Sequence, residues 1–345
     1  MGVINLMKKS TFLVFTMPSF LMMVFFIAAP LLIVIVQSFQ FNQDVLQTIE
    51  REKCDPFGCE TEIVTIPVLD ENGNTIKQNQ WVGFQNYKNL LKFNEVQEAF
   101  STIGEGWVDI RNIDFYKALR FTITFTFITL PFILFLGLVI ALCVNALLQS
   151  LRGPVIFMTL LPFIITPVIG SLSIKWLFIG DGILTVFLEW IQQKDISVFS
   201  NGWSVELLMM FYRVWHATPF AFVIFYAALQ TVDKEKIEAA IVDGANKFQR
   251  LRFIIIPHIM PLIVFVTLIH LMDAYRVFDE IIGFDAAAHR ISLQWLTYNF
   301  LMMDQGGNRF IGRASATSIL TMIGIVIILI PVLRKTWKDQ KEKKI

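Results

Sequence analysis

The sequence has little charge and few cysteines. Of its 345 residues, 17% are charged and 3 are cysteines, whereas 55% are hydrophobic. A soluble globular protein is about 25% charged and roughly 45–50% apolar. The apolar excess, with a mean hydropathy of +0.60, is too large for one soluble core. It excludes a disordered chain, a disulfide-rich secreted scaffold and a typical cytosolic enzyme. The net charge of +1 also gives no basic field for binding nucleic acid.

Catalytic and nucleotide-binding motifs are absent as well. The sequence contains no P-loop, no glycine-rich dinucleotide motif, no H-E-x-x-H and no G-x-S-x-G. The 4 histidines do not share the spacing of metal ligands. We therefore expect no enzymatic activity, no metal site and no cofactor bound by this chain.

What the sequence does contain is long apolar runs. A transmembrane helix needs about 20 mostly apolar residues. The sequence predicts an all-α polytopic membrane protein of about six transmembrane helices, at 13–36, 121–148, 155–178, 205–229, 253–278 and 315–333. Residues 183–191 are apolar but too short to cross, so they are interpreted as a surface or re-entrant helix. No small-residue cleavage site follows the first run, so we expect it to be a span rather than a signal peptide.

Basic residues orient these spans. Lys and Arg gather before the first span, between spans four and five, and in the C-terminal tail. By the positive-inside rule both termini should be cytoplasmic. The predicted organisation is a tail and first span (1–36), an outer loop (37–115), a core transmembrane domain (116–335) with a cytoplasmic loop at 231–252, and a basic tail (336–345).

The outer loop carries signs of structure of its own. Residues 61–83 alternate in polarity around Asn72-Gly73, which predicts a β-hairpin. Cys54 and Cys59 lie in the same loop. An oxidising compartment makes a disulfide between them one interpretation, and two free thiols the other. Zinc binding is disfavoured because no histidine or second cysteine pair accompanies them.

The segment between spans four and five is unusual. A charged, alanine-rich stretch from Asp233 to Asp243 predicts a short surface helix, and Gly244 should end it. A second helix should then run into span five through Pro257. This helix–glycine–helix on the cytoplasmic side suggests a docking element for a soluble partner. The alternative interpretation is an ordinary amphipathic helix at the membrane surface.

The same segment contains an E-A-A triplet, a D-G-A triplet and two later prolines, at Glu238, Ala239, Ala240, Asp243, Gly244, Ala245, Pro257 and Pro261. This pattern resembles the signature of permease subunits of binding-protein-dependent ABC importers. The resemblance extends over about residues 80–335, through WVGFQNYKNLL, WHATPFAFVIFYAALQ and GRASATSIL, and is nearest to the carbohydrate-type permeases of maltose and glycerol-phosphate systems. One stretch departs from that type, since IGFDAAAHRISLQWL replaces the usual T-x-G-G-P sequence.

This resemblance implies a function without catalysis. The chain would form half of a translocation pore in the cell inner membrane, for a sugar or related polyol delivered by a periplasmic binding protein. Its partners would be a second homologous permease and two ATP-binding subunits, which would hold the ATP. Glu238, Ala239, Ala240, Asp243, Gly244 and Ala245 would couple the pore to them. The alternative is a secondary transporter or channel subunit. That would need inverted repeats or coupled-ion sites, and no repeat is visible.

Polar residues inside the spans are candidates for the solute path. A charge at the centre of a span costs about 2.5–3.5 kcal/mol on insertion scales, so it should face a wet cavity or a partner. One group in span four comprises Tyr212, Arg213, Trp215 and His216. A second in span five comprises His270, Asp273 and Arg276, which are three residues apart and hence on one helix face. The alternative for span five is that Asp273 and Arg276 pair with each other or with the second permease.

Overall fold

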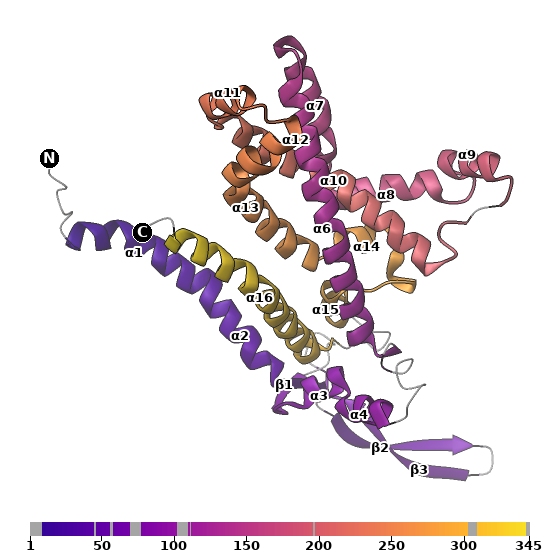
Figure 1. Ribbon diagram of the computed structural model, residues 1–345. Helices are drawn as coiled ribbons and strands as arrows, with labels where there is room; N and C mark the ends of the chain where they lie inside the picture. Colours follow the sequence, from indigo (N-terminus) through magenta and orange to yellow (C-terminus); the bar gives the residue numbers. More distant parts are fainter. Residues whose placement is uncertain are drawn as a thin grey trace. The chain divides into compact units, whose positions relative to one another are not determined.

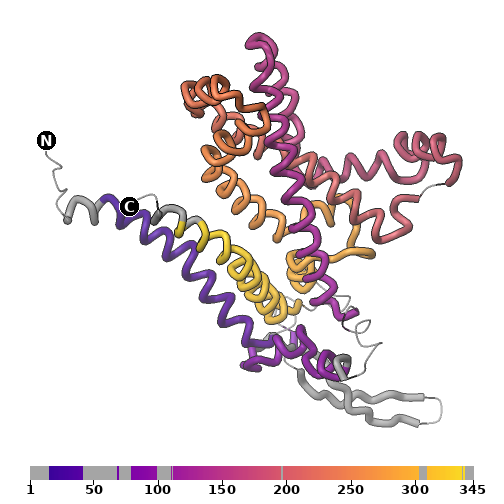
Figure 2. The backbone as a smooth tube through the Cα atoms, viewed as in Figure 1, coloured from indigo at the N-terminus to yellow at the C-terminus, as the bar shows by residue number. Residues whose placement is uncertain are grey.

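The computed structural model describes residues 9–44, 46–55, 58–69, 77–101, 110, 112–195, 197–302 and 309–342 (Figure 2). The chain forms two compact units. The first comprises Met1–Asn94 and Thr297–Leu320, and the second comprises Glu95–Leu296 and Thr321–Ile345.

The first unit begins with a long apolar helix. It consists of α1 (Lys9–Met23), a π-helical turn η1 (Val24–Ala28) and α2 (Ala29–Ser38). Phe15–Ser38 is long and apolar enough to cross a membrane. Pro30 removes one backbone donor near the start of α2, and the helix widens into the π-helical turn just before it.

Two short β-ribbons and a helix follow this span. Strand β1 (Gln40–Asp44) pairs antiparallel with β4 (Lys77–Trp81), and β2 (Leu46–Asp55) pairs antiparallel with β3 (Gly58–Pro67). Helix α3 (Gln85–Leu91) comes next, and α4 (Phe93–Ser101) begins at the end of this unit.

The predicted hairpin around Asn72-Gly73 is wrong in its pairing. Strand β3 pairs with the preceding β2, while β4 pairs back to β1. Asn72 and Gly73 themselves lie outside the described residues. Alternating polarity identifies a strand but not the strand that it pairs with, and here neither β3 nor β4 pairs with the strand that the hairpin prediction gave it.

The second unit is a helical bundle. Its elements are α6 (Asp114–Ala146), α7 (Gln149–Ile164), α8 (Pro167–Phe178), α9 (Ile183–Gln192), α10 (Gly202–Gln230), α11 (Lys234–Val242), α12 (Lys247–Arg250), η2 (Leu251–Ile255), α13 (Ile256–Tyr275), α14 (Asp279–Phe284), the 3-10 turn η3 (Ala286–Ala288) and the start of α15 (Leu293–Leu301). Helix α16 (Ile311–Glu342) begins in the first unit and continues in the second.

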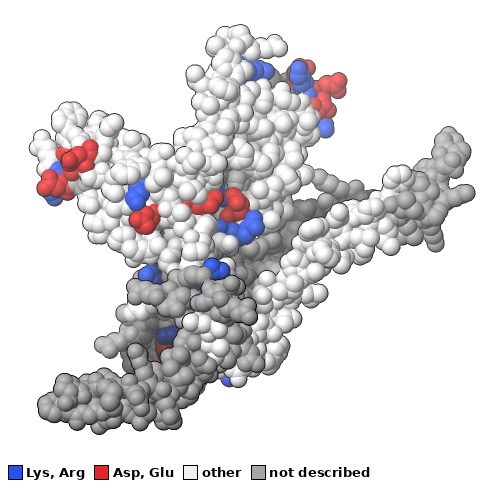
Figure 3. Space-filling view, turned by 180° about the vertical axis from the view of Figure 1, so that it is seen from behind, with Lys and Arg blue, Asp and Glu red and all other residues white. Residues whose placement is uncertain are grey.

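Helix α6 is central to this bundle, because α10 and α13 both pack along it (Figure 1). The fully buried side chains at these contacts include Phe121 and Phe125 of α6, Met209 and Phe222 of α10, and Val266 of α13. Outside these contacts many large apolar side chains are exposed. Figure 3 shows a described surface that is mostly uncharged, as expected for helices surrounded by lipid.

Among the described residues, five helices are long and apolar enough to cross a membrane, or six if α7 and α8 are counted as one broken span. The span predicted at 155–178 is broken in the structure, because α7 and α8 meet at an angle of 92°. Pro167 begins α8 and holds the preceding Thr166 in extended backbone, which ends α7. The short helix expected at 183–191 is confirmed as α9.

Candidate functional site: a buried charge cluster and an exposed helical turn

Three charged side chains from three helices meet in the second unit. Arg213 of α10 donates hydrogen bonds to Asp273 of α13 and to Glu280 of α14, the latter at 3.1 Å from Nη1 to Oε1. The side chains of Arg213 and Glu280 are 6% and 2% exposed, whereas that of Asp273 is 57% exposed. One cation thus faces two carboxylates, one buried and one open to the surroundings.

Three buried nitrogen atoms in and beside this cluster have no hydrogen-bond partner among the described residues. His270 lies one helical turn before Asp273 and is buried, and its ring meets Phe220 edge-on at 5.4 Å. Within the described part of the chain, neither ring nitrogen of His270 has a hydrogen-bond partner, nor does Nε of Arg213. Buried polar groups are normally hydrogen-bonded, so these nitrogens have hydrogen-bonding capacity that the described residues do not use.

The cluster is negative overall. Asp273 and Glu280 together carry one more charge than Arg213, and half-buried Asp279 adjoins them. Burial raises the pKa of the Asp279 carboxyl, and the neighbouring Glu280 raises it further. A low-dielectric site of this kind disfavours any additional negative charge.

Tyr212 and His216 hold the broken span. The Tyr212 hydroxyl donates to the carbonyl of Pro167, and Nε2 of His216 donates to the carbonyl of Ile165, each at 2.9 Å. Irregular backbone at membrane depth must find such partners, because lipid offers none. These two predicted path residues therefore stabilise the bend between α7 and α8.

Close packing holds α14 against α8. Gly283 of α14 faces Ser171 of α8, and a Cβ at Gly283 would come within 2.8 Å of the Ser171 Cβ. Only glycine permits this approach. Because α14 carries Glu280, the contact fixes the buried carboxylate opposite Arg213.

The other two predicted path residues lie apart from the cluster. Trp215 lines an apolar groove of about 330 Å³ between α6, α7 and α10, together with Phe211 and Met158. Arg276 is exposed, and in the described residues it forms no ion pair. Asp273 instead pairs with Arg213 of the neighbouring helix.

Glu280 was not predicted from the sequence. It lies just beyond the predicted end of span five, where a charged residue carries no free-energy penalty for insertion into the membrane and so attracts no attention. The available signal was the acidic pair Asp279-Glu280 next to an apolar run, in a chain that has an arginine buried in span four.

A second feature is the turn between α10 and α13, hereafter the coupling turn (residues 233–250). Asp233 caps α11 by accepting the backbone N–H of Glu235 at 3.1 Å. At the other end Gly244 has φ +80°. Ala245 donates its N–H to the carbonyl of Ala240, and Gly244 donates to Ile241, which is a Schellman C-cap. The D-G-A triplet therefore ends the helix.

Helix α12 starts at once after this cap. Asn246 and Gln249 exchange backbone and side-chain hydrogen bonds of 2.8 Å in a capping box. The turn is thus held by its own hydrogen bonds at both helix ends.

The coupling turn leaves apolar side chains uncovered. Val242 is 87% exposed, Phe248 65% and Ile241 52%. Glu238, Ala239 and Asp243 are exposed too, whereas Ile237 turns inward and packs against Val232 and Ile259. A locally rigid turn with an apolar exposed surface is suited to binding another protein.

The remaining predicted site lies in the first unit. The register of β2 and β3 places Cys54 directly opposite Cys59. The side chains of both lie outside the described residues. Among the described residues no group of three potential ligands could hold a metal ion.

No protein-family model matches this chain. It is 30% identical to a probable ABC transporter permease protein of Pyrococcus horikoshii, over 58% of this chain and 68% of that one. It is 26% identical to the arabinooligosaccharides transport system permease protein of Halalkalibacterium halodurans, over 67% and 74% of the two chains.

The fold has a relative among solved structures. A crystal structure of a bacterial ABC transporter that imports the acidic polysaccharide alginate matches with a TM-score of 0.67 and 18% identity, over 96% of each chain. That likeness concerns the fold. The sequence relatives identify this chain as a transport permease and not an enzyme, and as a member of the ABC transporter permease family.

Proposed function

We propose that this chain forms one half of a solute pore that is moved by ATP-binding subunits docked on the coupling turn. The carrying observation is the exposed apolar surface of that turn, at Ile241, Val242 and Phe248, on a backbone fixed by two caps. Glu238 and Asp243 lie beside it and provide charges for a partner. ATP is bound by those subunits, so this chain needs no cofactor.

The turn is connected mechanically to the charge cluster. Helix α12, the π-helical turn η2 and α13 form one continuous span from Lys247 to Tyr275. At its far end, that span carries His270 and Asp273. A displacement of the coupling turn would be transmitted along this span as a rigid-body movement, and would change the contact between Asp273 and Arg213.

Copurification tests the docking. The chain purified from its native membranes should retain an ATPase and a second permease. Val242→Glu should release the ATPase without lowering the amount of this chain, since Val242 is exposed. The matched control Ile237→Glu should lower the amount of protein, because Ile237 packs inward. A chain that transports without any ATPase would favour a secondary transporter or channel instead.

The same proposal fixes orientation. The turn must face the cytoplasm, which agrees with its basic residues. We place the protein in the cell inner membrane with both termini cytoplasmic. A fluorescent protein that matures only in the cytoplasm should therefore be bright when fused after Ile345, and a dark fusion would contradict this orientation.

The solute is proposed to be an uncharged sugar or polyol. Two of the relatives named above belong to systems for arabinooligosaccharides, which are neutral, and for alginate, which is acidic. In this chain the charge cluster has two carboxylates and one guanidinium, so it carries a net negative charge and repels an acidic solute. Two unit charges at 4 Å interact by about 4 kcal/mol at an effective dielectric constant of 20. His270 and the Nε of Arg213 offer neutral and cationic hydrogen-bonding groups for hydroxyls.

Delivery by a periplasmic binding protein and closure of the pore by a second permease complete the proposal. Tyr212, Arg213, His216, His270 and Asp273 would line or shape the path. The experiment is competition for uptake. Neutral oligosaccharides should compete and acidic ones should not, and Asp273→Asn should reduce that discrimination. Equal competition by acidic sugars in the unmodified protein would contradict the assignment, while leaving the ATPase docking untouched.

A further inference from the structure

An aromatic cluster lies at the end of the first span, where α2 stops. The ring of Phe39 stacks on Trp81 at 5.6 Å and meets Phe84 edge-on at 5.2 Å. Tyr87 completes the group, with its ring 5.7 Å from that of Phe39. We call these four residues the aromatic collar.

Hydrogen bonds fasten the collar to the end of the span. Asn86 is buried and donates from Nδ2 to the carbonyls of Ser38 and Gln40, each at 2.9 Å. The Tyr87 hydroxyl donates to Oγ of Ser38 at 2.8 Å. The terminal carbonyls of a helix need such partners. The collar therefore stays at a fixed height relative to the last turn of α2.

That height is also where the apolar span ends. Phe39 directly follows the span Phe15–Ser38. Another candidate span begins at Ile311, and the adjoining Gly312 lies against the backbone of Gln40. Two spans thus end at the same level within this unit.

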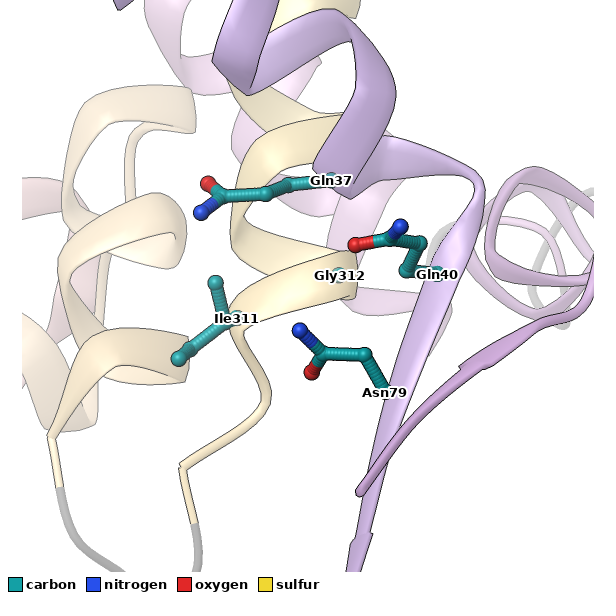
Figure 4. A pocket seen from close by; sticks show the side chains of 5 residues that line it. All are labelled: Gln37, Gln40, Asn79, Ile311 and Gly312. Carbon is teal, nitrogen blue, oxygen red and sulfur yellow. The ribbon is translucent and has the colours of Figure 1, made fainter. Parts of the chain in front are cut away.

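Polar groups mark the water side of the same level. The amides of Gln37, Gln40 and Asn79 gather beside Ile311 and Gly312 around a small cavity of about 70 Å³ (Figure 4). A group of three side-chain amides belongs outside the hydrocarbon core of the membrane, because inside that core each amide would need a hydrogen-bond partner from the protein.

Parts of the collar are strongly exposed. Trp81 is 65% exposed and Phe84 67%, although both rings pack on Phe39. Helix α3 turns Asn86 and Leu90 inward and leaves Lys88 exposed. Large aromatic rings with a neighbouring lysine, at the end of a span, match the residues that proteins place in the lipid headgroup layer.

We propose that the aromatic collar is a lipid-binding surface that anchors the end of the first span in the phospholipid headgroup layer. Trp81 and Phe84 lie among the carbonyl and glycerol groups, and Lys88 faces the phosphates. The hydrogen bonds of Asn86 and Tyr87 to the end of α2 keep the first span at a fixed depth in the membrane. The proposal depends neither on the solute nor on the ATPase contact.

Photo-crosslinking in native membranes tests this directly. A benzophenone amino acid replaces Trp81 or Phe84 in the full transporter, and the adducts are identified by mass spectrometry. Both positions should give phospholipid adducts. Gln80 is the matched control, because successive side chains of β4 point to opposite faces, and its lipid yield should be several-fold lower.

The other outcomes overturn the proposal. Adducts to another polypeptide at Trp81 and Phe84 would assign the collar to a protein interface. Lipid yields no higher than at Gln80 would place it in water. The yield of assembled complex checks that each variant folds. Lys88→Glu should in addition lower the adduct yield with anionic phosphatidylglycerol, with little change for zwitterionic phosphatidylethanolamine.

Discussion

Arg213 of α10 and Glu280 of α14 form an ion pair in which both side chains are almost completely buried. A pair like this adds little net stability, because both charges have lost their hydration. Its effect is that neither residue can be removed alone without leaving a buried charge unpaired. It therefore fixes α14, and the α8 helix packed on it, relative to α10.

Removing one partner of this pair should be costly. Glu280→Ala leaves the Arg213 charge buried with only Asp273, and we expect a loss of about 3–5 kcal/mol. The measurement is the thermal stability and yield of the purified complex.

Asp273→Asn is the informative comparison. Its side chain is 57% exposed and Arg213 keeps Glu280, so stability should change much less than in Glu280→Ala. Uptake should change instead, if Asp273 lies on the solute path. A variant as unstable as Glu280→Ala would assign Asp273 a structural role.

The coupling turn gives a second prediction. Gly244→Asp should leave the amount of complex almost unchanged, because nothing lies within 4 Å of a Cβ built there and Asp is one of the few residues that adopt a left-handed backbone. Uptake and ATP hydrolysis stimulated by the binding protein should fall, since the charge enters the ATPase contact.

Gly244→Asn is the matched control for backbone strain. Asn and Asp both tolerate a left-handed backbone, here φ +80°, and differ in charge. The Asn variant should therefore retain more transport than the Asp variant. Uptake at the unmodified rate in Gly244→Asp would refute the docking assignment.

The broken span gives a third prediction. Tyr212→Phe removes the hydrogen bond to the Pro167 carbonyl and leaves that carbonyl without its partner, at a cost of about 1–3 kcal/mol. Tyr226→Phe in the same helix is the control, and should be neutral. Thermal unfolding of the purified complex compares them, and equal stability of the two variants would mean that the bend does not need Tyr212.

The β2–β3 ribbon gives a fourth prediction. Because Cys54 lies opposite Cys59, a disulfide between them is sterically feasible. We expect a linked peptide in a non-reduced digest analysed by mass spectrometry. The closed ring is short, so its stabilisation is about 2 kcal/mol and should be confined to this ribbon. Two separately alkylated cysteines would refute the bridge.

Local patterns determined much of this protein. Apolar runs located the spans, since their length is set by the membrane and not by neighbouring helices. The turn at Gly244 was also predictable, because the residues that end α11 and begin α12 are adjacent in the chain. The family signature lies in this same local segment.

Tertiary structure decided the rest. The partner of Arg213, the hydrogen bond from Tyr212 that holds the bend at Pro167 and the pairing of β1 with β4 all depend on residues far apart in the sequence. Two arginines were candidates for an ion pair with the carboxylate of Asp273, namely Arg276 on the same helix and Arg213 on another. Sequence spacing alone favoured Arg276, which is three residues away. The fold placed Arg213 beside both Asp273 and Glu280, because a buried charge needs an opposite charge as its partner, whereas the side chain of Arg276 is exposed.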